Sequence, residues 1–339
     1  MQELKVGVVG CGRWGSNFIR VLSSMDGCRL LGVLDTDPRQ ARKFAKGDIK
    51  AFDNAEKMVK SLKLDAVVIA SPATAHREVA VKCLKAGAHV LVEKPLATTE
   101  KDCIDMAKAA EKAKKVLMVG HVFHYNRGVQ KMKSIVDSGE IGDLRYMYCV
   151  RTNLGPIRDD VNVLWDLAAH DVSIMMNLVG EVPSEVTASG QPYLRREIAD
   201  VAFGTLFFKK RNIMGHLQVS WLDPHKVRSL TIIGTDKMAV FDDVNTQEPI
   251  RIFNRGVVQD KVYDDFGHFQ MVLRDGDIMI PHVVLAEPLR AEAAHFLQCV
   301  RNNEKPITDA GHGTDVVRVL TALDESLRSR GKPVRIKGA

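Results

Sequence analysis

The feature that most constrains this chain is a G-x-G-x-x-G motif close to the N-terminus. Residues 4–9 are apolar and largely β-branched, which is typical of a strand buried on both faces. Gly10, Gly12 and Gly15 follow at once, and apolar residues then recur at helical spacing. A second apolar run, residues 30–34, ends on an acidic residue. Strand, glycine turn, helix, strand and acid in this order predict a βαβ unit.

Each position of the motif suits a bound dinucleotide. Gly10 allows a tight turn, Gly12 leaves room for a pyrophosphate, and Gly15 lets the helix lie close to the sheet. The phosphates would meet the free N–H groups at the positive end of the helix dipole. The alternative is a glycine-rich turn in an unrelated α/β protein. The predicted cofactor-binding residues of this loop are Gly10, Cys11, Gly12, Arg13, Trp14 and Gly15.

The acid that ends the second strand, Asp35, bears on which dinucleotide binds. Its carboxylate can accept hydrogen bonds from both hydroxyls of the adenosine ribose, and it would repel a 2′-phosphate. Arg39 and Arg42 lie nearby in the sequence and weaken that repulsion. We therefore expect NAD, with NADP as the less favoured alternative.

Length and composition limit the class of protein. A chain of 339 residues predicts about two domains. With 45% hydrophobic and 27% charged residues it has the composition of a globular protein with an ample core. No apolar run reaches the ~20 residues that a membrane-spanning helix needs. The first strand starts after only three residues, so we expect no signal peptide.

The cysteines and the net charge exclude further classes. The six cysteines are scattered without a C-x-x-C pair, which predicts no disulfide framework, no metal site and a cytoplasmic location. A net charge of +6 permits an anionic partner. The basic residues are dispersed, and no helix-turn-helix, zinc-finger or RNA-binding motif is present. A phosphorylated or carboxylated small molecule is therefore a better candidate than nucleic acid.

Residues 4–121 alternate between apolar runs and helical segments. This alternation predicts a doubly wound parallel sheet of the Rossmann type, an α/β fold. Ligands of such sheets bind beyond the carboxyl ends of the strands. The residues that follow the predicted strands 64–70 and 90–92 are therefore candidate cofactor contacts: Ser71, Pro72, His76, Glu93 and Lys94.

Two of these side chains carry possible chemistry. Lys94 follows a buried strand and precedes Pro95, so its position beside the nicotinamide end of the groove would be fixed. The alternative is a solvated surface lysine. His76 would contact substrate or cofactor, or would only occupy the first turn of a helix over residues 78–86.

From residue 144 the pattern changes to successive strands joined by turns. The predicted strands are residues 144–153, 185–190, 201–208, 212–221, 228–233 and 238–241, and helices over 289–301 and 314–330 follow. This order predicts an α+β domain with a large, mostly antiparallel open sheet. We expect a dinucleotide-binding domain over residues 1–122 and a substrate-binding and oligomerisation domain over residues 123–339. An open sheet face is commonly buried between subunits, which favours a homodimer or homotetramer.

One helix, predicted over residues 163–179, interrupts these strands. Asp166, His170, Ser173 and Asn177 would share one face of it. The ordinary pKa of histidine suits removal of a hydroxyl proton at neutral pH, and an aspartate one turn away could orient the imidazole. The alternative is a solvated polar face.

The motifs together resemble one enzyme family. G-x-G-x-x-G, Ser-Pro-x-x-x-His after the fourth strand and Glu-Lys-Pro after the fifth strand are similar to those of the Gfo/Idh/MocA oxidoreductases. The resemblance implies hydride transfer between nicotinamide and a secondary hydroxyl of a sugar. It also implies that Lys94, Asp166 and His170 flank the nicotinamide ring. His170 would be the acid or base, Lys94 the donor that polarises the hydroxyl, and Asp166 the residue that orients the imidazole.

The substrate is less constrained by these motifs. The family's Arg-Phe-x-Pro segment is replaced here by residues 121–127, which include Tyr125. Arginines can bind phosphate bidentately and tryptophan can stack on a sugar or base, although charges on edge strands can also only guard a sheet. The predicted substrate-binding residues are Lys94, Tyr125, Arg151, Asn153, Asp166, His170 and Trp221.

This set is similar to that of nucleotide-sugar oxidoreductases that act on a UDP-N-acetylhexosaminuronate. The alternatives are a dehydrogenase of a free sugar or an inositol-like polyol, and a non-catalytic NAD-binding regulator. A regulator would be expected to lose the set of Lys94, Asp166 and His170, which this chain keeps.

Overall fold

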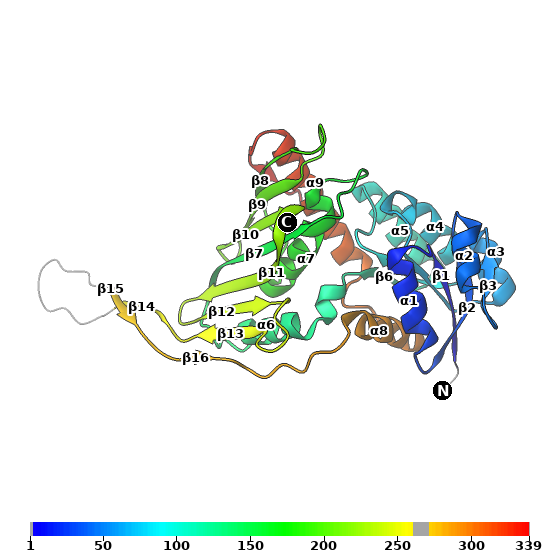
Figure 1. Ribbon diagram of the computed structural model, residues 1–339, viewed down its shortest axis with the longest axis horizontal. Coiled ribbons are helices and arrows are strands. Elements are labelled where there is room, and N and C mark those ends of the chain that lie inside the picture. Colours follow the sequence, from blue (N-terminus) through cyan, green and yellow to red (C-terminus); the bar gives the residue numbers. More distant parts are fainter. Residues whose placement is uncertain (1–2, 260–270, 339) are drawn as a thin grey trace, which may run out of the picture. The chain divides into compact units, whose positions relative to one another are not determined.

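The computed structural model describes residues 3–259 and 271–338, and the chain forms two compact units (Figure 1). Unit 1 comprises Met1–Tyr125 and Glu287–Arg318, and unit 2 comprises Asn126–Ala286 and Val319–Ala339. The chain therefore returns to unit 1 late in the sequence, which a single boundary after residue 122 does not describe. Residues 1 and 2, at which we expected a start without a signal peptide, lie outside the described residues.

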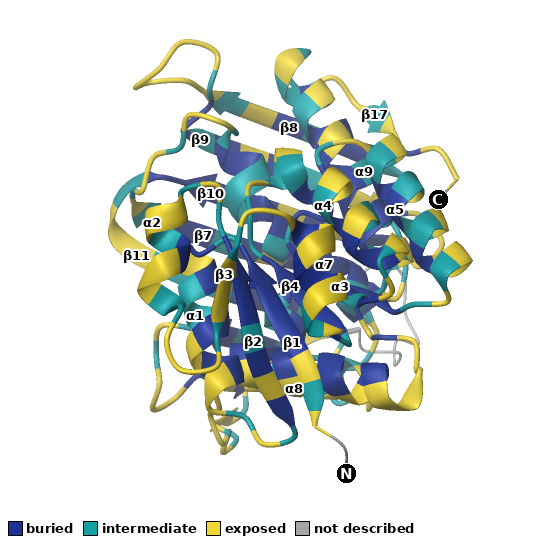
Figure 2. Cartoon of the chain, turned by 90° about the vertical axis from the view of Figure 1, so that its right-hand side faces the viewer, coloured by how far each residue is buried: buried dark blue, intermediate teal, exposed yellow. Residues whose placement is uncertain are grey.

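Unit 1 is built on a six-stranded parallel sheet with the strand order β3-β2-β1-β4-β5-β6. The order reverses between β1 and β4, which is the point at which such sheets bind ligands. The predicted Rossmann fold is confirmed, and the inner strands are buried as their apolar runs require (Figure 2). Its strands are β1 (Leu4–Val9), β2 (Cys28–Leu34), β3 (Lys50–Phe52), β4 (Ala66–Ile69), β5 (His89–Glu93) and β6 (Leu117–Gly120).

The helices of unit 1 begin at residues that satisfy their free N–H groups. The side chains of Asp37, Asn54 and Thr99 accept hydrogen bonds from the first turns of α2, α3 and α5. The helical elements of this unit are α1 (Arg13–Ser23), α2 (Pro38–Phe44), α3 (Ala55–Leu62), α4 (Ala73–Lys85), α5 (Glu100–Ala113), the 3₁₀ helix η1 (Val122–Tyr125) and α8 (Pro288–Asn302). The long helix α9 (Ala310–Arg328) starts in unit 1 and ends in unit 2.

Apolar packing explains why α8 belongs to unit 1. Leu289 and Phe296 of α8 join the same buried cluster as Phe18 of α1 and Tyr125 of η1. Buried apolar area is the main source of stability in such a cluster. The predicted helix over residues 289–301 therefore forms, and it completes the core of the first unit.

Unit 2 is built on a nine-stranded sheet with the order β16-β13-β12-β11-β7-β10-β9-β8-β17. All neighbouring strands are antiparallel except β7 and β10, so the predicted mostly antiparallel sheet is confirmed. The strands are β7 (Leu144–Leu154), β8 (Glu185–Gln191), β9 (Val201–Phe208), β10 (Ile213–Ser220), β11 (Leu222–Gly234), β12 (Met238–Asp242), β13 (Ile250–Phe253), β16 (Ile278–Met279) and β17 (Val334–Arg335). A separate hairpin joins β14 (Gly256–Gln259) and β15 (Met271–Arg274).

One face of this sheet is covered by helices. The helix α6 (Arg127–Asp137) packs against β12, α7 (Ala169–Val179) packs against β10, and leucines at the end of α9 lie over β8 and β9. The helix predicted over residues 163–179 forms in two parts, because the π-helix η2 (Leu164–Ala168) precedes α7. Asp166 therefore lies in a turn that is wider than the α-helical turn the sequence predicts. Nine of the eleven residues of α7 are buried, and the other two, His170 and Asn177, are half-buried and belong to the predicted polar face.

A buried ion pair fixes α7 to the sheet. On β7, Arg151 donates from Nε and Nη2 to Oδ1 of Asp171 at 3.0 and 2.8 Å, and the two side chains are only 7% and 2% exposed. Burial opposes the guanidinium charge, but the Asp171 carboxylate outweighs it and raises the pKa of Arg151 above its ordinary value. Because each charge satisfies the other, loss of one partner leaves an uncompensated buried charge.

We expect Asp171→Ala to lower the free energy of unfolding by about 3–5 kcal/mol, the usual cost of breaking a buried pair. Urea unfolding of the variant and the native chain measures this difference. Glu78→Ala is the control, because it removes one member of the exposed Glu78–Lys82 pair on α4 and should cost far less. Equal losses in the two variants would contradict a special role for the buried pair.

Candidate active site

The glycine loop of unit 1 has the geometry of a phosphate-binding turn. Gly10 has φ = +88°, and a Cβ on it would lie 2.6 Å from the main chain of Ala70. A Cβ on Gly15 would lie 1.7 Å from the carbonyl oxygen of Gly10, whereas one on Gly12 would meet nothing within 4 Å. Gly12 therefore faces open space at the start of α1, and no acidic residue stands in the first turn of that helix. Free N–H groups, a positive dipole end and open space together fit a pyrophosphate.

Asp35 is held against this loop at the end of β2. Its Oδ2 accepts a hydrogen bond from the main-chain N–H of Cys11 at 2.7 Å, and its Oδ1 accepts one from Asp37 at 2.9 Å. A carboxylate has about four lone-pair sites, so both oxygens can still accept ribose hydroxyls. Nearby, the guanidinium of Arg39 pairs with Asp37. The donor and acceptor set at this position therefore fits an adenosine ribose with a free 2′-hydroxyl.

The side chains of the loop itself face different environments. The thiol of Cys11 is buried and lies 3.6 Å from the carbonyl oxygen of Leu34. Burial, and secondarily the charge of Asp35, raise the pKa of Cys11 to about 12, so it stays a neutral thiol. Arg13 and Trp14, by contrast, are exposed in the first turn of α1. The loop thus offers its main chain, rather than the Cys11 thiol, to a ligand.

His76 connects the loops that follow β4 and β5. The predicted start of helix α4 is residue 78, but the helix begins at Ala73. His76 therefore lies in its first turn, and its ring is buried. Its Nδ1 is 3.0 Å from the carbonyl oxygen of Pro95, and its Nε2 is 2.8 Å from that of Ser71. Burial lowers the pKa of His76 below its ordinary value. A neutral imidazole has one N–H, so the ring donates to one of these two carbonyl oxygens and only contacts the other. The ring packs between the two loops that carry the predicted cofactor contacts, and Pro72 lies exposed between Ser71 and α4.

Glu93 and Lys94 end β5, next to β4 in the sheet. The Glu93 side chain is buried, and its Oε2 accepts a hydrogen bond from the Lys94 main-chain N–H at 3.1 Å. Burial raises the pKa of Glu93 to about 7, and the Lys94 charge opposes this shift. Lys94 is half-buried. The lysine therefore stands on a strand end whose main chain is fixed by a buried carboxyl group.

In unit 2, the carboxylate of Asp166 is held on two sides. Oδ2 accepts a hydrogen bond from Nε1 of Trp221 at 3.1 Å, and Oδ1 lies 3.3 Å from Nη1 of Arg158. His170 is half-buried at the second position of α7. The structure thus orients Asp166 before any ligand binds.

The predicted substrate-binding residues differ in their surroundings. Trp221 is fully buried, so its indole has no open face for a sugar and instead positions Asp166. Arg151 is neutralised by Asp171. Tyr125 is buried in the core of unit 1, and Asn153 donates to the carbonyl oxygen of Gly155 at 2.5 Å. Three of these side chains, Trp221, Arg151 and Tyr125, are thus buried, and the half-buried Asn153 is hydrogen-bonded to the main chain of its own loop.

The structure contains a cluster of histidine rings and a buried glutamate that the sequence does not predict. The rings of His121, His124 and His312 lie together in unit 1, with centroids 4.9–6.3 Å apart. Glu292 of α8 is fully buried. His121 and His124 share a helical turn, but His312 and Glu292 are distant in sequence and carried no signal. Among residues 3–259 and 271–338, no cluster of histidine, cysteine and acidic side chains is arranged to hold a metal ion.

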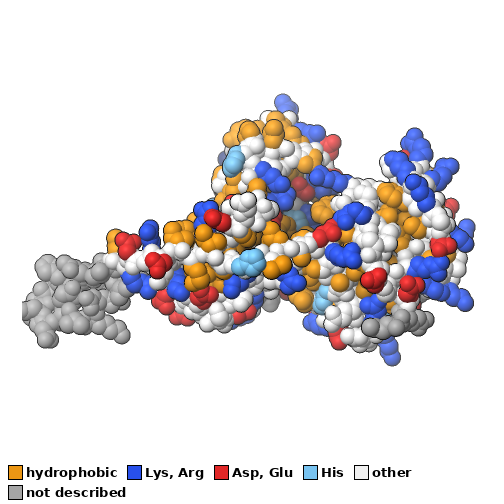
Figure 3. Space-filling model, turned by 60° about the horizontal axis from the view of Figure 1, so that its bottom comes forward, with side chains coloured by type: hydrophobic (Ala, Val, Ile, Leu, Met, Phe, Trp, Pro, Cys, Tyr) orange, Lys and Arg blue, Asp and Glu red, His pale blue; other side chains and the backbone are white. Residues whose placement is uncertain are grey.

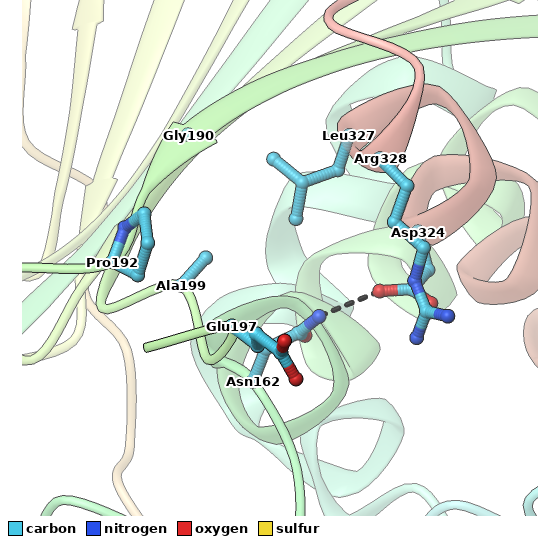
Figure 4. Close-up of a pocket in the computed structure, with 8 residues that line it drawn as sticks. All are labelled: Asn162, Gly190, Pro192, Glu197, Ala199, Asp324, Leu327 and Arg328. Carbon is cyan, nitrogen blue, oxygen red and sulfur yellow. Dashed lines mark hydrogen bonds and ion pairs between the residues drawn. The ribbon is translucent and has the colours of Figure 1, made fainter. Parts of the chain in front are cut away.

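A pocket of about 170 Å³ lies in unit 2 (Figure 4). Its polar walls are paired with each other, since Asp324 accepts a hydrogen bond from Asn162 at 2.6 Å and pairs with Arg328 at 2.8 Å. None of its lining residues is a predicted catalytic residue. The lining residues are Asn162, Gly190, Pro192, Glu197, Ala199, Asp324, Leu327 and Arg328.

The sequence predicts that basic residues are dispersed over the surface. On the face shown in Figure 3, side chains of both charge signs are present, and lysine and arginine gather in a group at the upper right. All six cysteines are free and buried. In the described part of the chain, no helix has the length and apolar character needed to cross a bilayer.

Two models of known protein families match the chain. A model described as "Oxidoreductase family, NAD-binding Rossmann fold" matches residues 4–121, and the "GFO/IDH/MocA C-terminal domain" matches residues 129–240. The chain belongs to the Gfo/Idh/MocA oxidoreductase family. The resemblance based on the glycine, Ser-Pro and Glu-Lys-Pro motifs is therefore confirmed.

One curated Gfo/Idh/MocA relative matches about half of the chain. Inositol 2-dehydrogenase 2 of Saccharopolyspora erythraea is 32% identical over 191 residues, which are 55% of this chain and 56% of that protein. The match thus spans about half the length of this curated relative.

Solved structures extend further. UDP-N-acetylglucosamine 3-dehydrogenase GnnA from Acidithiobacillus ferrooxidans has a TM-score of 0.83 at 23% identity, and the alignment covers 97% of this chain and 99% of that one. The WlbA dehydrogenase from Bordetella pertussis, in complex with NADH and UDP-GlcNAcA, has a TM-score of 0.80 at 23% identity and full coverage of both chains. At this identity they establish a shared fold.

The glycine loop yields a paired prediction. Gly12→Ala should fold with an unchanged Tm but bind NAD at least about tenfold more weakly, because its Cβ would occupy the open space offered to the pyrophosphate. Gly15→Ala should instead destabilise the fold by about 1–3 kcal/mol or more, because its Cβ overlaps the Gly10 main chain. Calorimetric NAD titration and thermal unfolding separate the two effects. Full NAD affinity in Gly12→Ala would contradict the site.

Proposed function

We propose that this Gfo/Idh/MocA protein is an NAD-dependent dehydrogenase that transfers hydride between nicotinamide and a secondary hydroxyl of a UDP-sugar, such as a UDP-N-acetylhexosaminuronate. The observation that carries the proposal is the position of Lys94. Its strand end neighbours the switch point of the sheet, and a buried glutamate fixes its main chain. A cation carried on a fixed main chain at this edge suits stabilisation of the oxygen of a reacting alcohol.

In this proposal each catalytic residue has one task. Bound NAD supplies the hydride acceptor. His170 takes the hydroxyl proton as the carbonyl group forms, and Lys94 donates a hydrogen bond to the same oxygen. Asp166 orients the imidazole or a neighbouring hydroxyl, and its own carboxylate is positioned by Trp221 and Arg158. The hydroxyl proton thus goes to His170, and the hydride goes to NAD.

The choice of NAD over NADP is supported by the end of β2. Asp35 presents a carboxylate where the adenosine ribose would lie, and a 2′-phosphate would be repelled by it. Of the two cations that could offset this repulsion, Arg39 pairs with Asp37, and Arg42 donates from Nε to the carbonyl oxygen of Pro38.

The substrate class has two supported candidates. A UDP-sugar is supported by the full-length likeness to dehydrogenases whose names include UDP-sugars. A neutral polyol such as inositol is favoured by a different observation: Arg151 is neutralised inside the fold, which leaves fewer cations for a diphosphate. A purely regulatory NAD-binding protein would not need the ordered carboxylate of Asp166.

We also propose that the chain forms a homodimer or homotetramer through the open face of the sheet in unit 2. Tyr146, Met214 and Phe207 form one row across β7, β10 and β9, and Tyr148 and Phe203 extend the patch. These five apolar side chains are 37–44% exposed. Exposed apolar patches of this kind commonly mark interfaces between proteins. A chain that sediments as a monomer at micromolar concentration would exclude both assemblies.

We propose that the protein resides in the cytoplasm. Six free, buried thiols suit the reducing cytoplasm.

A cofactor and substrate screen tests the function. We expect nicotinamide reduction with NAD and a UDP-sugar, measured by the absorbance of the reduced ring, and little with NADP. His170→Asn should lower kcat by about 10²–10⁴-fold, the usual contribution of a general base, without weakening NAD binding. Turnover of inositol but of no UDP-sugar would favour the polyol reading. Tight NAD binding without turnover of any substrate would favour the regulator.

A further inference from the structure

The strands β7 and β11 place two arginines side by side in unit 2. In the antiparallel register of these strands, Arg151 of β7 lies opposite Arg228 of β11. Directly opposed residues carry their side chains on the same face of the sheet, about 5 Å apart. The Arg151 guanidinium is bound by Asp171, the residue after His170 on α7. Arg228 therefore lies on the face that carries α7, close to the segment that holds His170.

The two guanidinium groups are satisfied to different degrees. Arg151 donates to both carboxylate oxygens of Asp171. In contrast, Nε of Arg228 is buried and has no hydrogen-bond partner among the described residues. Its ion-pair partner, Oδ2 of Asp243, lies 3.6 Å from Nη1, which is too far for a hydrogen bond. Because a guanidinium has five N–H donors, Arg228 keeps capacity for a further acceptor.

Asp243 is itself held by other groups. Its Oδ1 accepts a hydrogen bond from Nδ2 of Asn126 at 2.9 Å, and its main-chain N–H donates to the carbonyl oxygen of Arg228 at 2.9 Å. The carboxylate thus stays beside the Arg228 guanidinium as a counter-charge. It does not close a bidentate pair, as Asp171 does with Arg151.

The positive charge of Arg228 is therefore compensated only in part. Burial, and secondarily the neighbouring charge of Arg151, lower the pKa of Arg228 below its ordinary value, although a guanidinium stays charged. The Arg228 side chain is 36% exposed while its Nε is buried, so other atoms of the side chain reach solvent. A half-buried cation of this kind suits an anionic oxygen group that arrives from solvent, because the hydrogen bonds are charge-assisted.

We propose that Arg228 is a substrate-binding residue that takes an anionic oxygen group, either the carboxylate or the diphosphate of a sugar nucleotide. Asp243 keeps the guanidinium in place, and Arg151 stays engaged with Asp171. Arg228 then supplies the cation that the neutralisation of Arg151 removes from the site. The assignment rests on the proposed function, because it takes the surroundings of His170 as the substrate site.

Binding of two sugar nucleotides to the full chain saturated with NADH tests this role. UDP-N-acetylglucosaminuronate carries a carboxylate and a diphosphate, whereas UDP-N-acetylglucosamine carries the diphosphate alone. In calorimetric titrations, Arg228→Gln should bind the uronate about 10–100-fold more weakly than the native chain does, the usual effect of losing a hydrogen bond to a charged group. Arg251→Gln is the control, because it changes an exposed arginine on β13 of the same sheet and should leave the affinity unchanged.

The second sugar nucleotide separates the two anionic groups. An equal loss of affinity for both compounds would assign Arg228 to the diphosphate, and a loss confined to the uronate would assign it to the carboxylate. Unchanged affinity of Arg228→Gln for both compounds would overturn the proposal. A native chain that binds neither compound would overturn it as well.

Arg228→Lys separates binding from support of the fold. This variant keeps the charge but loses the planar fork of donors, so it should unfold at the native Tm and bind the uronate with an affinity between those of the native chain and Arg228→Gln. If Arg228→Gln fails to fold and the folded Arg228→Lys binds both compounds as the native chain does, Arg228 only supports the fold and the proposal is wrong.

Steady-state kinetics give a further readout. Arg228→Gln should raise the KM for the UDP-sugar by a factor similar to its loss of affinity, with little change in kcat or in the KM for NAD. A fall in kcat at unchanged KM would contradict a role in binding. If the native chain binds a UDP-sugar through Arg228 but transfers no hydride, the proposed function fails and the assignment of Arg228 stands.

Discussion

The close approach of α1 to β1 is the constraint on which the rest of unit 1 depends. The carbonyl oxygen of Gly10 occupies the space where a Cβ of residue 15 would stand, so no side chain larger than hydrogen fits without a shift of the main chain. This approach directs the free N–H groups of α1 toward the open space at Gly12, and it brings the Cys11 N–H to the Asp35 carboxylate. One steric requirement thus sets both the phosphate-binding end and the ribose-binding end of the loop.

Buried polar groups fix the segments that carry the candidate site residues. His76 links the loops after β4 and β5, Glu93 holds the Lys94 main chain, and Trp221 holds the Asp166 carboxylate in unit 2. Each of these supporting side chains is buried, where an unsatisfied polar group is costly and a satisfied one therefore has little freedom. The residues proposed to do chemistry are half-buried and rest on this fixed layer.

Much of the fold could be predicted because local patterns were strong. The bounds of β1 and β9 follow from apolar runs and alternation, and the family is specified by short motifs on strand ends. The environment of Arg151 was also readable, since it shares the two-residue period of the buried Met147 and Cys149 and must face the covered side of the sheet. This period predicts a buried Arg151, whereas the chemistry of arginine favours an exposed phosphate-binding role.

Other features depend on partners distant in the sequence. The π-helix before α7 has no periodic signature, and the packing of α8 on unit 1 joins residues more than 160 positions apart. An indole near cations suits a sugar platform, but only the three-dimensional neighbours of Trp221 reveal that it is buried against Asp166.

The central claim is that the ammonium group of Lys94 acts on the oxygen of the reacting alcohol. The most direct measurement is the single-turnover rate of nicotinamide reduction in Lys94→Ala, with and without added small alkylamines. The account predicts normal NAD affinity, a large loss of the hydride-transfer rate, and partial rescue by an alkylammonium ion that fits the vacated space. A hydride-transfer rate equal to that of the native chain would contradict it.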